Sequence, residues 1–291
     1  MTYGFLLYKY STNGTPERFI NLLRFPLPMT EILVTNDDGY TSAGFITLVK
    51  ELSKIYSVTA VVPDRGRSWI GKAITTKKEL KLKKTTHDGV EMFLLNGTPA
   101  DCVQIGLYDI VPTRPRLVIS GINIGLNIGQ ARTLSSGTIG AAIEGSIDGV
   151  RSLASSLSIP LALRDKKTDF YHSHSYPLFE NAAKITTKIT TILMNKAFEG
   201  IDLFSLNIPF HATVDTPLEI TTLFKTRYGR LFHKKGNRFI HQTPPIHFKN
   251  METKSDLKAL SENRISLTPM SLSFGTCQPS DSVEHAFKQE W

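Results

Sequence analysis

Short apolar runs alternate with helix-like segments from Thr30 onward, and this alternation constrains the fold more than any other feature of the chain. After the first run, Phe45, Leu48 and Leu52 recur at the spacing of a helix that buries one face. Strands that alternate with helices form βαβ units, so we expect an α/β fold with a mostly parallel sheet. Buried strands are expected at 31–35, 58–63, 116–120, 152–159 and 202–209, the last of these being the last strand of the core.

A charged segment interrupts this pattern at 75–84. Its lysines alternate with Leu80 and Leu82, which is typical of an exposed or edge strand. The apolar run at 90–95 is the natural partner for that strand. We therefore expect a strand pair at one edge of the sheet, in which the lysines form a solvated face.

Three helix starts can be placed from local signals. Thr98 followed by Pro99 has the pattern of an N-cap and a first helical residue. A second helix is expected to begin at Thr138, after a glycine-rich loop at 121–137, and a third covers 178–194. Residues beyond 209 no longer follow the βα pattern and are expected to form extended arms, one short helix and a final strand.

We divide the chain into four segments on this basis. Residues 1–29 are either a disordered leader or a mis-assigned start with Met29 as the natural first residue, since they show no periodicity. Residues 30–209 are the core, 210–275 an arm and return segment used for oligomerisation, and 276–291 a loose C-terminal tail.

Composition limits the class of protein. Thirty-four basic and 26 acidic residues give a net charge of +8, which suits anionic ligands but is too diffuse to demand a stable nucleic-acid partner. The two cysteines, Cys102 and Cys277, form no framework, so we expect a reducing, cytoplasmic setting. No apolar run approaches the roughly 18 residues that span a bilayer, and no secretory signal is recognisable, so no membrane partner is expected.

Polar clusters follow three of the expected strands. They are 36–38 after the first strand, 64–68 after the second, and 120–123 after the strand at 116–120. Because the carboxyl ends of parallel strands share one edge of a sheet, these clusters should converge. Two carboxylates, Asp37 and Asp38, with hydroxyl and amide oxygens make an all-oxygen site that suits Mg²⁺ or Mn²⁺. The alternative is that Asp-Asp-Gly is only a polar turn.

A candidate anion site precedes the helix at 138. Ser136, Gly137 and Thr138 place small side chains and backbone N–H groups at a helix start, and Asn123 and Asn127 precede them in a glycine-spaced loop. A plain N-cap with close packing of small residues is the alternative. The spacing is neither GxGxxG nor GxxxxGK[ST], which disfavours a dinucleotide fingerprint and a P-loop.

Other features carry less weight. His172 and His174 lack a third nearby ligand, and Ser68 lacks the G-x-S-x-G elbow of a serine hydrolase. Lys72 is either a surface lysine or one that faces a phosphate. The segment 36–41 does not fit the aspartyl-nucleophile motif of haloacid dehalogenase phosphatases.

Six motifs together resemble the SurE family of survival-protein 5′-nucleotidases. They are "ILVTNDDGYTSAG", "VVPDRGRS", "GKAIT", "NGTPADCV", "VISGINIGLNIG" and "SSGTIGAAIEG". The resemblance is dense over 30–165 and weaker near the C-terminus. It implies a Rossmann-like three-layer core with a mostly parallel sheet, and C-terminal arms exchanged between subunits of a homodimer or homotetramer.

The resemblance also implies an activity and a set of site residues. The activity is divalent-metal-dependent hydrolysis of nucleoside 5′-monophosphates by metal-activated water, with 3′-monophosphates and short polyphosphate as further candidate substrates. One Mg²⁺ or Mn²⁺ ion would be the cofactor. The matching metal ligands are Asp37, Asp38, Ser68 and Asn123, with Asp37 and Asp38 also catalytic, and the matching phosphate-side residues are Asn127, Ser136, Gly137 and Thr138.

The chain departs from the family pattern at positions that bear on substrate preference. Trp69 stands where glycine is usual, Gly66 where asparagine is usual, and Ser135 where many relatives have tyrosine. The arm between 227 and 247 lacks the usual "DPRG…YYW" segment. A catalytically weak nucleotide- or polyphosphate-binding protein is therefore the alternative function.

Overall fold

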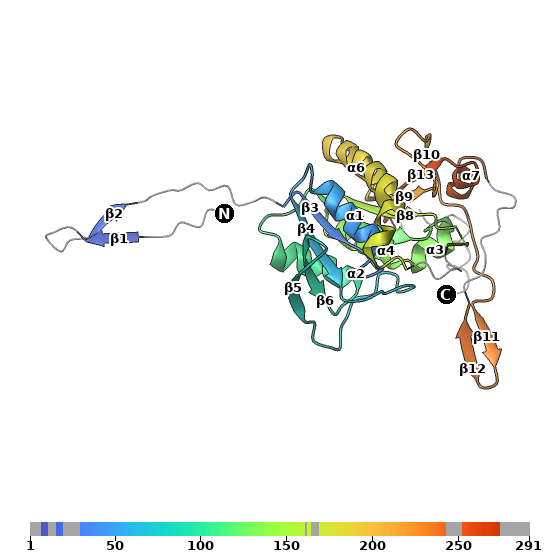
Figure 1. Cartoon of the computed structure of the whole chain (residues 1–291), viewed down its shortest axis with the longest axis horizontal. Coiled ribbons are helices and arrows are strands. Elements are labelled where there is room, and N and C mark those ends of the chain that lie inside the picture. The colour runs from blue at the N-terminus through green and yellow to red at the C-terminus, as the bar shows by residue number, and fades with distance from the viewer. Residues whose placement is uncertain are drawn as a thin grey trace, which may run out of the picture.

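The computed structural model describes residues 7–10, 16–19, 30–160, 162–163, 169–242 and 252–273 (Figure 1). Met29, most of the expected leader at 1–29, Cys277 and the tail at 276–291 lie outside the described residues. In the described part of the chain, no helix is long and apolar enough to cross a membrane.

A mostly parallel sheet forms the centre of the structure (Figure 1). Its strands are β3 (Ile32–Thr35), β4 (Val58–Pro63), β5 (Leu82–His87), β6 (Val90–Leu95), β7 (Leu117–Ile124), β8 (Ser152–Leu157), β9 (Leu203–Ile208), β10 (Leu218–Ile220) and β13 (Ile265–Met270). Their order is β10-β13-β9-β8-β7-β3-β4-β6-β5. Neighbours are parallel except at β5–β6 and β13–β9. The expected α/β fold with a mostly parallel sheet is confirmed.

Helices cover both faces of this sheet. The described helices are α1 (Ala43–Leu52), α2 (Pro99–Ile105), α3 (Gly129–Ser135), α4 (Gly137–Ile147), α6 (Glu180–Asn195) and α7 (Asp256–Ser261), with a π-helical turn at Gly106–Ile110 and a 3-10 helix at Ser173–Phe179. α1 packs on α6 over one face, and α2 packs on α4 over the other. Two hairpins stand apart from the main sheet, β1 (Leu7–Tyr10) with β2 (Pro16–Phe19) and β11 (Phe232–Lys235) with β12 (Arg238–His241).

The side chains of the central strands explain the three layers. Along β3, Ile32 and Val34 belong to the core beneath α1 and α6, whereas Leu33 belongs to the core that contains Cys102 and Val103 of α2. Successive residues of a strand point to opposite faces, and all three β3 side chains are buried. A strand buried on both faces reads as the continuous apolar run that the sequence contains.

The edge strand begins later than expected. The structure places β5 at 82–87 rather than at 75–84, although its antiparallel pairing with β6 agrees with the prediction. Residues before Leu82 are held by side chains instead of a strand ladder: Lys81 N–H donates to Asn96 Oδ1 at 2.7 Å, and Thr75 N–H donates to Asp101 Oδ1 at 3.0 Å. Those side-chain acceptors compete with strand pairing.

The glycine-rich segment 121–137 is not a simple loop. β7 continues to Ile124 through a cis peptide bond between Gly121 and Ile122, and α3 follows. The start of α3 depends on residues far along the chain, because Gln130 N–H donates to Phe224 O at 2.9 Å. A local reading of the sequence cannot include that partner.

The sheet also extends beyond the strand expected to be last. β13 pairs antiparallel with β9, and β10 pairs parallel with β13. The expected short helix and final strand after the arm are present as α7 and β13, and β13 joins the main sheet beside β9. Residues 222–228 then run beside α3, and the β11–β12 hairpin projects from the body (Figure 1).

Candidate active site

A cavity of about 140 Å³ opens at the carboxyl ends of β3, β4 and β7. β3 pairs with β4 on one side and with β7 on the other, so the direction of strand order reverses there. Ligands of open α/β sheets bind at such a point. Six of the eight predicted site residues line the cavity: Asp37, Asp38, Ser68, Asn123, Asn127 and Ser136.

The Asp pair lies in a turn that another residue closes. Asn36 donates from Nδ2 to Gly39 O at 2.9 Å and accepts at Oδ1 from Gly39 N–H at 3.1 Å. Gly39 has a φ of 94°, which suits glycine. The segment is thus a turn, as the alternative interpretation held, but Asn36 forms it. These two hydrogen bonds do not involve the carboxylates of Asp37 and Asp38, which line the cavity and are largely buried.

Contacts with distant segments hold the two carboxylates in place. Asp38 Oδ2 accepts a hydrogen bond from Ile124 N–H at 2.9 Å, which joins the end of β3 to β7. Thr138 Oγ1 donates to Asp37 Oδ1 at 2.6 Å. Burial raises the pKa of Asp37, and hydrogen bonds from the Thr138 hydroxyl and from the backbone N–H groups of Thr138 and Gly137 oppose that rise.

Gly137 and Thr138 therefore lie behind the cavity wall, against Asp37. A Cβ at Gly137 would lie 2.8 Å from Asp37 Cβ and 3.0 Å from its Oδ2. Only glycine lets the start of α4 approach this carboxylate so closely. The helix start binds an anion, as its N-terminal N–H groups and dipole favour, and in the described structure that anion is the Asp37 side chain.

The asparagines of the cavity are held by their amide nitrogens. Asn123 Nδ2 donates to Gly125 O at 2.8 Å, and Asn127 Nδ2 donates to Ser156 Oγ at 2.9 Å. These bonds orient each side chain and leave its amide oxygen for a ligand. Ser136 is the N-cap of α4 and accepts from Ile139 N–H, so its hydroxyl proton remains available to donate.

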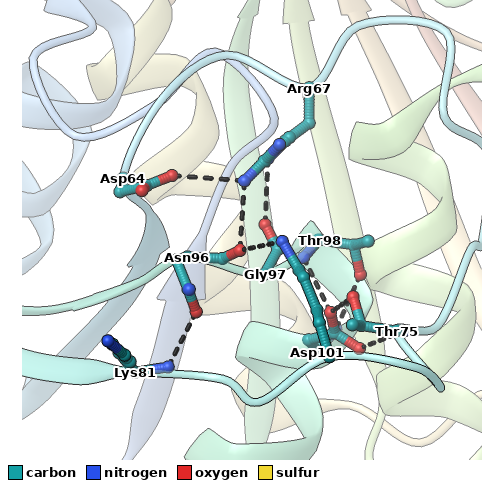
Figure 2. A network of polar contacts seen from close by, with 9 residues as sticks. Asp64, Arg67, Thr75, Lys81, Asn96, Gly97, Thr98 and Asp101 are labelled. Carbon is teal, nitrogen blue, oxygen red and sulfur yellow. Dashed lines mark hydrogen bonds and ion pairs between the residues drawn. The ribbon is translucent and has the colours of Figure 1, made fainter.

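Ser68 lines the cavity. A polar network around the preceding residue, Arg67, holds its loop (Figure 2). Arg67 donates from Nε to Gly97 O at 3.0 Å and from Nη2 to Asn96 O at 3.2 Å. Its Nη2 also lies 3.3 Å from Asp64 Oδ1, and its backbone N–H donates to Asp37 O at 2.6 Å. Arg67 thus ties the Ser68 loop to the segment after β6 and to the end of β3.

The expected helix start at Thr98 belongs to the same network (Figure 2). Thr98 and Asp101 form a reciprocal capping box at the N-terminus of α2. Asp101 also accepts from the Thr75 hydroxyl at 2.5 Å, and Thr98 Oγ1 donates to Ala73 O at 2.7 Å. The "NGTPAD" motif therefore supports the loop that carries Ser68, and it does not line the cavity.

Six residues that line the cavity are not among those predicted from the sequence, and three of these, Trp69, Arg132 and Ser135, bring an aromatic, charged or hydroxyl side chain. Arg132 belongs to α3, a helix that lies where the sequence predicts a loop. The available signal was an arginine four positions before Ser136. Trp69 and Ser135 stand out in the sequence only as departures from the family pattern.

Two other sequence features lie outside the cavity. Lys72 forms an ion pair with the buried Glu144 of α4, so it does not face a ligand there. His172 pairs with Asp169 at 2.8 Å. Within the described residues, no group of three or more His, Cys, Asp or Glu side chains is placed to hold a metal ion.

The cavity itself offers a different donor set. Two carboxylates, a hydroxyl and an amide oxygen, from Asp37, Asp38, Ser68 and Asn123, face one space. Such hard oxygen donors fit Mg²⁺ or Mn²⁺ and not a thiolate- or imidazole-bound metal. Two adjacent, largely buried carboxylates are costly unless a positive charge compensates them, and Arg132 is the one basic residue among those that line the cavity. The residues present therefore fit a divalent cation.

Comparisons with known proteins agree with the fold. The sequence model for "Survival protein SurE" matches residues 32–230. The protein "5′-nucleotidase SurE" of Methanocella arvoryzae is 31% identical, with 89% of this chain and 98% of that protein covered. Its namesake from Moorella thermoacetica is 35% identical, over 89% and 94%. The crystal structure of the SurE protein from Aquifex aeolicus superposes with a TM-score of 0.69 at 27% identity, covering 88% and 99%. This chain therefore belongs to the SurE family.

Proposed function

We propose that the protein is a divalent-metal-dependent phosphomonoesterase that hydrolyses nucleoside 5′-monophosphates. The observation that carries this proposal is the convergence of two buried carboxylates, a serine hydroxyl and an asparagine amide on a cavity that also contains an arginine. The printed name of the relatives, 5′-nucleotidase, supports the choice of substrate.

The charge balance of the cavity supports the need for a cation. Asp37 and Asp38 outnumber Arg132, so a phosphate dianion would be repelled from the cavity of the protein alone. Asp37, Asp38, Ser68 and Asn123 are the residues that would hold one Mg²⁺ or Mn²⁺ ion. When bound, such an ion supplies Lewis acidity, which polarises a phosphoryl oxygen and lowers the pKa of water.

The remaining residues are assigned to the substrate. Ser136, with its free hydroxyl proton, and Asn127 would bind phosphate oxygens, and Arg132 would compensate the charge that builds on them. Gly137 and Thr138 would contribute through Asp37, which their N–H and hydroxyl groups hold. One of the two aspartates would orient the attacking water and accept its proton, in line with the departing ribose oxygen.

Phosphate release is the direct test. The purified protein is assayed with 5′- and 3′-nucleoside monophosphates and with short polyphosphate, in Mn²⁺, in Mg²⁺ and in EDTA. We expect release from 5′-monophosphates that depends on the metal, and loss of turnover in Asp37→Asn without loss of fold by circular dichroism. Turnover that persists in EDTA or in the variant would overturn the assignment.

A second function has one observation in its favour. Trp69 occupies a position where the family pattern has glycine and adds an exposed ring to the cavity, which suits binding without turnover. The protein would then be a weak catalyst that binds nucleotides or polyphosphate. Saturable binding of a monophosphate without phosphate release would favour this alternative.

Oligomerisation and location complete the proposal. We propose a cytoplasmic homodimer or homotetramer that uses the arm at 210–275, without a stable nucleic-acid partner. Exposed apolar side chains on the β11–β12 hairpin, namely Phe232, Phe239 and Ile240, support this use of the arm. Light scattering after size exclusion tests it, with Phe239→Asp expected to weaken the assembly and a monomeric wild type contradicting it.

A further inference from the structure

Three aromatic side chains from two distant parts of the chain meet beside the cavity. The ring of Trp69 lies 4.7 Å from that of His241, edge to face, and 5.5 Å from that of Tyr228. Trp69 follows Ser68, whereas Tyr228 and His241 belong to the arm and to the end of β12. We call these three residues the aromatic wall.

Backbone and side-chain contacts fix the wall at both ends. The Trp69 loop is held before the ring by Arg67 and after it by a hydrogen bond of 3.0 Å from Gly71 N–H to Ser135 O. Tyr228 donates from its hydroxyl to the backbone oxygen of Ala131 in α3, the helix that carries Arg132. The wall is thus attached to the same two segments that supply cavity residues.

Two features of Trp69, its backbone conformation and its exposure, are unfavourable, and packing alone does not explain them. Its φ is 62°, in the left-handed region that costs a non-glycine residue about 1–2 kcal/mol. Its side chain remains 38% exposed although it makes two ring contacts. Backbone strain and an exposed indole together are characteristic of a binding position.

We propose that the aromatic wall receives the nucleobase of the substrate, and that Trp69 is the residue that sets this preference. This inference rests on the proposed function, because it places the base of a nucleoside monophosphate beside the cavity that would hold its phosphate. Trp69 lines that cavity together with Asp37 and Asp38, so one ligand can contact both the ring and the polar end. A base offers the flat π-face that an indole edge or face binds.

The competing interpretation is that Trp69 only fixes the arm. In that case the ring would matter equally for every phosphomonoester, because it would act through the shape of the site. A base-binding ring discriminates between esters instead. Loss of one base–aromatic contact corresponds to about a tenfold or greater loss of affinity. We expect purine nucleotides to gain more than pyrimidine nucleotides, since the larger ring buries more surface.

The test compares two substrates in matched variants. Trp69→Gly removes the ring and also relieves the backbone strain, whereas Trp69→Phe keeps an aromatic ring. Tyr108→Ala removes an exposed aromatic ring outside the cavity lining, from the π-helical turn at 106–110, and is the control. The measurement is kcat/KM for adenosine 5′-monophosphate divided by kcat/KM for glycerol 1-phosphate.

We expect this ratio to fall about tenfold in Trp69→Gly, through KM for the nucleotide, to recover largely in Trp69→Phe, and to stay unchanged in the control. An unchanged ratio in Trp69→Gly, or an equal loss on both esters, overturns the inference. If the wild-type protein releases phosphate from neither ester, the proposed function is contradicted, and the binding measurement below decides whether the aromatic wall binds a base.

A binding measurement separates these two outcomes further. In a Trp291→Phe background, Trp69 is the one tryptophan left in the chain, which has two. Adenosine, which has no phosphate, is titrated in EDTA while indole fluorescence is followed. We expect saturable quenching that His241→Ala weakens, independent of metal and turnover. Absence of quenching at millimolar adenosine overturns the assignment of the wall even if the protein is an active nucleotidase.

Discussion

The hydroxyl of Thr138 lies 2.6 Å from Asp37 Oδ1 and donates a hydrogen bond to it, across 101 positions of sequence. The first residues of α4 thereby hold a carboxylate from the end of β3. A helix N-terminus stabilises an anion, and here it stabilises a proposed metal ligand. Residues that the sequence associates with phosphate thus act first on Asp37.

Replacing Thr138 by valine keeps the shape of the side chain and removes this hydrogen bond. Partners that orient a metal ligand contribute about 10- to 100-fold to metal affinity or activity, so we expect a loss in that range for Thr138→Val. Titration calorimetry with Mn²⁺ and kcat/KM measure the two effects. Thr138→Ser retains the hydroxyl and should behave like wild type. Unchanged Mn²⁺ affinity in the valine variant would mean that Thr138 does not act through Asp37.

Gly137 gives a steric test of the same contact. Alanine there would place Cβ 2.8 Å from Asp37 Cβ, so the carboxylate or the start of α4 must move. We expect Gly137→Ala to lose about tenfold or more in Mn²⁺ affinity, in the range of other lost ligand supports. Gly66→Ala is the matched control, because its Cβ would meet the backbone of Asp38 only at 3.5 Å. Equal behaviour of the two alanine variants would argue against a steric role for Gly137.

The sequence predicts the central strands well because each is buried on both faces. Leu33 and Val34, for example, face different cores, so the apolar pattern is continuous and local. Convergence of the clusters near Asp37, Ser68 and Asn123 follows from parallel strand direction alone. These parts of the fold and the site depend on information that is close in sequence.

The parts that could not be predicted depend on distant partners. The sequence predicts a loop where the structure has α3. The helix could not be predicted because distant residues complete its start: Phe224 O accepts from Gln130 N–H, and Thr226 Oγ1 accepts from Ala131 N–H at 2.9 Å. Arg132 was missed for the same reason. β13 likewise joins the sheet only after a long excursion of the chain, and periodicity within a short window does not report which strand becomes its neighbour.

Arg67 should control the loop that carries Ser68 (Figure 2). Its guanidinium donates to two backbone carbonyls, Gly97 O at 3.0 Å and Asn96 O at 3.2 Å, and Asn96 O also accepts from Lys78 Nζ at 2.9 Å. We expect Arg67→Ala to lower the free energy of unfolding by about 1–3 kcal/mol and to weaken Mn²⁺ binding, because the loop that carries Ser68 loses these hydrogen bonds. Arg67→Lys should not restore them, because a lysine lacks the planar fork of donors. Urea denaturation and calorimetry measure both. Arg65→Ala, at an exposed position in the same loop, is the control. Lost stability with normal Mn²⁺ affinity would show that the loop does not position Ser68.

Asp256, the first residue of α7, joins the start of α3 to the arm. Its Oδ2 accepts from Gly129 N–H at 2.6 Å, and its Oδ1 accepts from Phe224 N–H at 3.0 Å and from Leu257 N–H at 2.8 Å. Burial raises the pKa of Asp256, and these three donors oppose the rise. The side chain is fully buried, so water cannot replace a lost acceptor.

Asp256→Asn therefore turns one acceptor into a donor that faces an N–H group. The expected cost is about 1–3 kcal/mol, which lowers the melting temperature by several degrees. Asp215→Asn, at an exposed position of the arm, should leave it unchanged. Because Gly129 begins the helix that carries Arg132, we also expect a higher KM for the nucleotide in the Asp256 variant, measured well below its melting temperature. A lower melting temperature with an unchanged KM would mean that the arm stabilises α3 without placing Arg132.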